Sequence, residues 1–113
     1  MLVRDPAHQR LRSGIYKITN KIDKKMYIGM ANNIQSRWAT HRKQLVGGYH
    51  ENIFLQKAVI QDGISSFLFE IIELCPKVDL RKREQHYLDT LSPFAELGYN
   101  IHRGYYIEGE DDL

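Results

Sequence analysis

The sequence predicts an α/β domain of the α+β type, with a small central three-stranded, mainly antiparallel sheet flanked by about three helices. Two observations predict this class. Short segments rich in β-branched and aromatic residues indicate strands. Longer segments that begin at Asn or Asp and mostly end at Gly indicate helices. The predicted order is β-β-α-α-β-α, and a length of 113 residues indicates one domain.

The first two strands are predicted to form a hairpin. Residues 14–20, "GIYKITN", and 26–31, "MYIGMA", are separated by the short polar segment "KIDKK". A third strand is predicted at 66–74, "SFLFEIIEL", where the apolar run stops at Cys75-Pro76. These segments supply the three strands of the sheet.

Three helices are predicted between and after the strands. The first covers 32–48, which opens with asparagines and closes with two glycines, and the second covers 52–63, which also closes with glycine. The third covers 79–91, with Asp79 as its N-cap. Residues 98–101, "GYNI", are predicted as a short extended piece.

Composition and charge indicate a soluble protein that binds a polyanion. The apolar share of 42% and the charged share of 27% are ordinary, and no apolar run approaches a membrane span or a signal peptide. The single cysteine, Cys75, favours a reducing, cytoplasmic location. Residues 1–43 hold ten Lys or Arg and two acidic residues, a balance of +8, which is typical of nucleic-acid binding. Alternatively, part of this charge only solubilises the hairpin loop.

One acidic residue breaks the packing pattern of the third helix. Glu84 lies four residues after Leu80 and four before Leu88, so its carboxylate is predicted on the buried face. A buried carboxylate needs a cation or hydrogen bonds. A metal site and a structural ion pair are both open at this point, although the neighbouring Arg81 and Arg83 are predicted to point away from that face.

The predicted first helix contains a second interruption of the packing pattern. Arg37 and His41 are four residues apart and are therefore neighbours, and His41 also falls in the apolar stripe. A lone histidine there would usually be a satisfied core residue, whereas the adjacent arginine favours a pair that faces phosphate.

The hairpin register decides whether two tyrosines meet. If Tyr16 lies opposite Tyr27, both phenols share one face beside Gly29. A register shifted by one residue separates them, and the sequence does not fix the register. A packed aromatic pair is the alternative interpretation.

Taken together, these residues resemble the GIY-YIG nucleases, most closely the catalytic domains of phage and intron homing endonucleases. The resemblance covers residues 13 to about 102, including "GIY" at 14–16 and "YIG" at 27–29. Further residues match family positions in order, namely Arg37, His41, His50, Glu84 and Asn100. Met30 departs from the family, because many relatives have Lys or Ser there.

The resemblance implies a metal-dependent DNA endonuclease that hydrolyses phosphodiester bonds. Glu84 would bind one Mg²⁺, with Mn²⁺ as an alternative ion. Arg37 would bind phosphate oxygens. Tyr16 is the family candidate for accepting the proton of water, with His41 and His50 as rivals.

The remaining catalytic candidates, Tyr27 and Asn100, would orient the reacting groups, or in the case of Asn100 bond the backbone. Histidines 8, 86 and 102 are expected to be uninvolved. The DNA phosphates are expected to contact four basic residues, Lys17, Lys25, Arg42 and Lys43.

The predicted domain plan is an N-terminal extension (1–12), the nuclease domain (13–103) and an acidic tail (104–113). Family relatives carry separate DNA-recognition domains. Three arrangements are therefore open: a stand-alone homing-type or mobile-element nuclease, a module of a longer protein, or a nuclease targeted by a partner protein. A non-catalytic nucleic-acid-binding module is the competing function.

Overall fold

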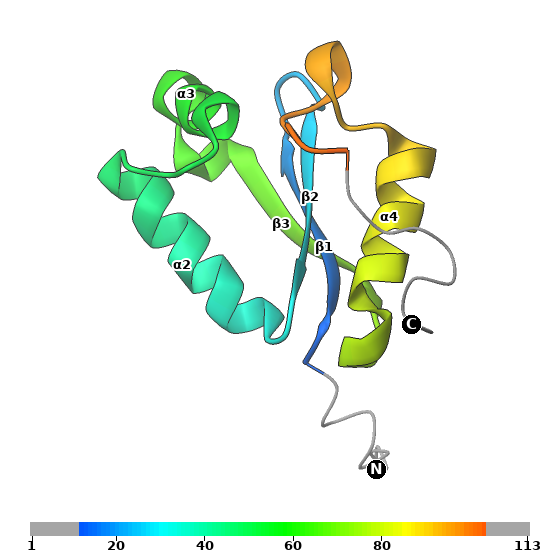
Figure 1. The fold of residues 1–113 in the computed structure, drawn as a ribbon. Coiled ribbons are helices and arrows are strands. Elements are labelled where there is room, and N and C mark those ends of the chain that lie inside the picture. The colour runs from blue at the N-terminus through cyan, green and yellow to red at the C-terminus, as the bar shows by residue number, and fades with distance from the viewer. Residues whose placement is uncertain (1–11, 104–113) are drawn as a thin grey trace, which may run out of the picture.

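The computed structural model describes residues 12–103 as a three-stranded sheet with helices on both faces (Figure 1). The predicted acidic tail at 104–113, and all of the predicted N-terminal extension except Arg12, lie outside the described residues. None of the helices within 12–103 is both long enough and apolar enough to cross a membrane.

The sheet has the predicted three strands, and they pair antiparallel as predicted. Its strands are β1 (Gly14–Asn20), β2 (Met26–Ala31) and β3 (Phe67–Leu74). β1 is central, and it pairs antiparallel with both neighbours in the order β2-β1-β3. The element order β-β-α-α-β-α and the fold class are therefore confirmed.

The hairpin register differs from the one considered above. Tyr16 pairs with Gly29, and Tyr27 pairs with Ile18, so the two tyrosines are diagonal neighbours rather than directly opposite. Because the register is displaced by two residues, both phenols still lie on the same face of the sheet.

The helices are α2 (Ile34–Gly47), α3 (Ile53–Asp62) and α4 (Leu80–Leu91). The first two begin at capping asparagines, which are Asn33 and Asn52. Asp79 is the N-cap of α4 by position, as predicted, but its side chain makes no capping hydrogen bond. The backbone of Asp79 already has helical dihedral angles and ends a short 3₁₀ turn (Lys77–Asp79), which explains the missing contact.

The pleat of β1 and β2 divides the core into two clusters. Tyr16, Ile18 and Ala31 face α2 and α3, whereas Ile15 and Ile28 face α4. Figure 1 shows α2 and α3 on one side of the sheet and α4 on the other. The GIY and YIG segments thus place alternate side chains against both helical layers.

β2 is an edge strand, and the segment after α4 closes only part of that edge. Gly98 forms a parallel bridge with Met26, and the Tyr99 amide donates to the Met26 carbonyl at 2.9 Å. The predicted extended piece at 98–101 is therefore a short bridge rather than a fourth strand. The side chain of Asn100 covers the next part of this edge, at Ile28.

Candidate active site

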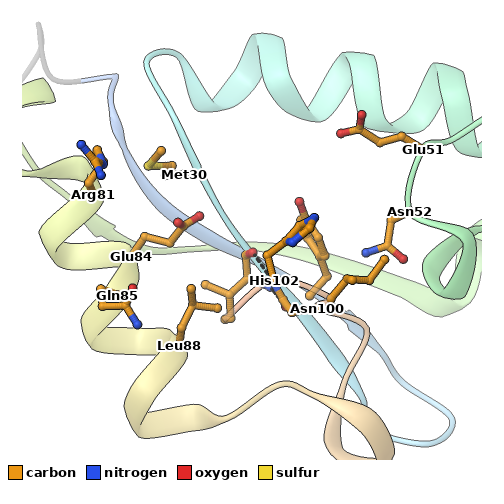
Figure 2. A pocket seen from close by; sticks show the side chains of 12 residues that line it. Met30, Glu51, Asn52, Arg81, Glu84, Gln85, Leu88, Asn100 and His102 are labelled. Atoms are coloured by element: carbon orange, nitrogen blue, oxygen red, sulfur yellow. Dashed lines mark hydrogen bonds between the residues drawn. The ribbon is translucent and has the colours of Figure 1, made fainter. Parts of the chain in front are cut away.

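A cavity of about 400 Å³ lies beside the edge strand β2, where the two helical layers meet (Figure 2). Tyr27 and Met30 of β2 form its floor, Glu84 of α4 forms one wall, and Glu51 and Asn52 from the α2–α3 connection form the other. A second hollow shares Met30 and is lined by Arg37. Segments distant in the sequence therefore meet around one edge of the sheet.

Glu84 points from α4 toward β2 in Figure 2. Its burial raises the pKa of the carboxyl group above the usual range. Arg83, one of the two arginines considered for a structural ion pair, binds Glu73 instead through two hydrogen bonds of 2.8 Å. Arg81 lines the same cavity as Glu84.

Tyr16, His41 and His50 form a hydrogen-bonded row behind the cavity. The Tyr16 hydroxyl lies 2.6 Å from His41 Nε2, and His41 Nδ1 lies 2.7 Å from His50 Nε2. β1 supplies the tyrosine, α2 supplies His41, and the loop after α2 supplies His50. All three side chains are buried. His41 is thus a satisfied histidine in the core, and its partner is a candidate catalytic residue.

The two tyrosines of the motifs sit in a site that disfavours their ionisation. Burial raises the pKa of Tyr16, and Tyr27 raises it further, whereas Arg37 acts in the opposite direction. Burial also raises the pKa of Tyr27, and the charge of Arg37 again opposes it. Arg37 is therefore the residue that favours a phenolate at this site.

Both histidines are neutral at neutral pH. Burial, together with His50 and Arg37, lowers the pKa of His41 to about 4. Burial also lowers the pKa of His50, although the carboxylate of Glu51 acts to raise it. Neutral imidazoles each carry one N–H and one acceptor nitrogen, so the row has a direction.

Asn100 bonds the backbone of the motif strand. Its amide oxygen accepts from the Ile28 N–H at 2.8 Å, and its amide nitrogen donates to the Ile28 carbonyl at 2.9 Å. The side chain thereby satisfies both polar groups of a residue on the edge strand β2. Of the two contributions considered for Asn100, the structure shows the bond to the backbone.

The four predicted phosphate contacts are not gathered in one place. Lys17 forms an ion pair with Glu70 at 3.8 Å, and the Arg42 guanidinium lies 4.6 Å from the centre of the Phe69 ring. Lys25 lines a separate cavity of about 260 Å³. Lys43 is exposed on α2. The contribution of these four residues to DNA binding stays a prediction.

Two lining residues were not anticipated. Glu51 points from the α2–α3 connection toward the cavity (Figure 2), and its charge acts to raise the pKa of Tyr27. His102, which was expected to be uninvolved, also lines the cavity. Neither shows a periodicity signal, because both lie in irregular segments. The position of Glu51 directly after His50 was the only available hint.

The site offers a divalent cation few protein ligands. Within residues 12–103, no group of three or more His, Cys, Asp or Glu side chains is arranged to hold a metal. Mg²⁺ commonly keeps several waters and binds through one or two carboxylates. A buried carboxylate with a raised pKa beside a cavity gains from a nearby cation, so Glu84 fits such an ion.

Comparisons with known proteins identify relatives of this chain by sequence and by fold. A model of the GIY-YIG catalytic domain matches residues 12–100. Intron-associated endonuclease 1 of Enterobacteria phage T4 is 36% identical over 93 residues, which are 80% of this chain and 37% of that protein. The chain therefore spans little more than a third of the length of this relative.

Two solved structures of an intron endonuclease have the same fold. The catalytic domain of homing endonuclease I-TevI is 35% identical with a TM-score of 0.72, over 80% of this chain and 98% of that one. A mutant of the catalytic domain of intron endonuclease I-TevI is 33% identical with a TM-score of 0.74, over 83% and 97% of the two chains.

Proposed function

The chain belongs to the GIY-YIG catalytic domain family, and on that basis we propose that it is an endonuclease that hydrolyses phosphodiester bonds in DNA with the help of a divalent metal ion. The observation that carries the proposal is the meeting of Tyr16, Arg37 and Glu84 at one edge of the sheet. Arg37 acts on the Tyr16 phenol and lowers its pKa, and the charge of Glu84 acts on the same phenol. Binding of nucleic acid alone requires no such group of three.

Glu84 is the proposed ligand of the metal, which is Mg²⁺, with Mn²⁺ as an alternative ion. When bound, such an ion neutralises charge on the phosphate and on the leaving oxygen. The carboxylate is held on the rigid helix α4 and faces the cavity. Because Glu84 is the one carboxylate that matches the family pattern, we propose that a single metal ion binds.

Arg37 and Tyr16 carry the other proposed contributions. The Arg37 guanidinium is exposed on α2 and presents paired donors suited to phosphate oxygens. Tyr16 is the proposed acceptor of the proton from the attacking water, since its hydroxyl lies next to Arg37 and is held by His41. Asn100 and the motif strand keep the floor of the cavity in place.

The biological setting is proposed from the relatives. The phage T4 relative is described as intron-associated, and the solved relative as a homing endonuclease. We propose a homing-type or mobile-element nuclease for this chain. Recognition of a long site would then come from a segment outside the catalytic domain or from a targeting partner protein.

Supercoiled plasmid provides the test. The protein is incubated with plasmid in Mg²⁺, in Mn²⁺ and in excess chelator. Nicked or linear product in the two metals and none in chelator would support the proposal. Binding of plasmid without cleavage under every condition would instead support the non-catalytic nucleic-acid-binding module.

A further inference from the structure

The row of Tyr16, His41 and His50 ends on a backbone amide. The N–H of Asn52 donates to His50 Nδ1 at 3.0 Å. The row therefore runs from the Asn52 amide through His50 and His41 to Tyr16. The distance from His50 Nε2 to His41 Nδ1 is 2.7 Å, and that from His41 Nε2 to the Tyr16 hydroxyl is 2.6 Å. All four residues are buried, so water does not supply alternative partners along it.

A backbone N–H can only donate, and this fixes the direction of the whole row. His50 Nδ1 must accept, so neutral His50 carries its proton on Nε2 and donates to His41 Nδ1. His41 then carries its proton on Nε2 and donates to the Tyr16 oxygen. The opposite direction would place two N–H groups against each other at His50 Nδ1.

An additional proton does not fit the row either. If His41 carried two protons, its Nδ1–H would displace the His50 proton onto Nδ1, facing the Asn52 N–H. Burial lowers the pKa of both imidazoles, in agreement with neutral rings. The remaining charged or titratable groups that act on Tyr16 are Tyr27, Arg37 and Glu84, and none of them belongs to the row.

We propose that the backbone N–H of Asn52 is a positioning group that sets both histidine tautomers, so that His41 acts as a hydrogen-bond donor to Tyr16 and not as a base that removes its proton. The Tyr16 oxygen then receives a donor from His41, and Arg37 acts on the same phenol through its charge. A proton acceptor at this position has to be a phenolate, and the His41 donor is in place for that charge. The tautomers are assigned from geometry alone. Their consequence for catalysis rests on the proposed function.

The loop that carries the Asn52 amide is held from both sides. The Asn52 side chain accepts from the amides of Phe54 and Leu55 at 3.0 Å each, and donates to the Tyr99 carbonyl at 2.9 Å. The His50 amide donates to the Gln56 side chain at 2.8 Å. A firmly held amide is what a tautomer-setting donor requires.

The direct test is ¹⁵N NMR of the full chain labelled at histidine, at neutral pH. Long-range ¹H–¹⁵N spectra show which ring nitrogen carries the proton. We expect the Nε2–H tautomer for both His41 and His50. An Nδ1–H tautomer or a charged ring at either position would overturn the proposal.

A matched pair of variants tests the amide itself. Asn52→Ala and Asn52→Pro both remove the side-chain contacts, but only the proline removes the N–H, and the φ of −82° at Asn52 is close to that of proline. We expect Nε2–H rings in Asn52→Ala and an Nδ1–H population in Asn52→Pro, with cleavage about tenfold slower than in Asn52→Ala. Unchanged tautomers in a folded Asn52→Pro would overturn the assignment. If this variant does not fold, the wild-type spectrum alone tests the assignment.

These experiments separate the proposal from the proposed function. Nε2–H tautomers in a protein that cleaves no DNA would refute the nuclease and support the assigned tautomers. Cleavage by a protein with the opposite tautomers would refute the assigned direction and leave the nuclease standing.

Discussion

Tyr16 on β1 lies directly across from Gly29 on β2, and its ring occupies the space that a side chain at position 29 would need. A Cβ atom at Gly29 would collide with the phenol ring. The glycine of the second motif is thus explained by the tyrosine of the first. The two motifs form one packed unit, and this unit aims the Tyr16 hydroxyl at His41.

Gly29→Ala should therefore destabilise the fold by about 1–3 kcal/mol, because overpacking forces the ring or the strand to move. In a Tyr16→Ala background the same substitution should cost less than about 0.5 kcal/mol. Urea unfolding of the four proteins in this cycle measures the coupling. Equal costs of Gly29→Ala in both backgrounds would contradict the packing explanation.

Acid should weaken the fold through His41. The pKa of about 4 in the folded protein lies below the ordinary value near ~6.5. The unfolded chain binds the proton more readily in this interval, so stability falls as the pH decreases from about 6.5 to about 4, by on the order of 1–3 kcal/mol. Unfolding free energies measured across this window should show a shallower slope in His41→Gln. A slope identical to that of the wild type would mean that His41 is not protected from protonation.

Arg37 should influence both the rate and its pH dependence. Arg37 lowers the pKa of Tyr16, so Arg37→Ala should move the alkaline rise in cleavage rate to higher pH. The variant should also lose roughly 10²-fold or more in rate, because the proposed phosphate donor is removed. Arg37→Lys keeps the charge but not the paired donors, and should recover only part of the rate. A pH–rate profile that does not shift in Arg37→Ala would exclude Tyr16 as the titrating group.

Glu51 should oppose DNA binding. Its carboxylate faces the same cavity as Glu84, where its negative charge would repel a DNA phosphate. Glu51→Gln in a Glu84→Ala background should tighten binding by roughly 2–5-fold, as expected for one exposed charge. Fluorescence anisotropy with a labelled duplex measures this change, with the Glu84→Ala protein as control. Weaker binding after Glu51→Gln would instead indicate that Glu51 assists the nucleic acid complex through a cation.

The elements were predictable because each carries a local signal. β-Branched strands and capping asparagines place the observed boundaries of β1, α2 and α3 within two residues of the predicted ones. Glu84 was identifiable because a carboxylate interrupts the apolar face of α4. Such signals depend only on residue type and spacing within one element.

Contacts between elements were harder to predict from the sequence. The exact pairing of Tyr16 with Gly29 depends on the hairpin loop and on packing, and the sequence leaves it open. The partner of Lys17, Glu70, lies on β3, which is distant along the chain. His102 enters the cavity from an irregular segment without periodicity. The direction of the histidine row required the position of one backbone amide.

The central claim is that Glu84 supports cleavage of DNA rather than only its binding. The most direct measurement follows cleavage and binding of one labelled duplex in Mg²⁺, in parallel, by the wild type and by Glu84→Ala. We predict equal binding by both proteins, cleavage by the wild type and none by the variant, because the proposed metal ligand is missing while the proposed phosphate contacts remain. Cleavage by Glu84→Ala at the wild-type rate would contradict the account.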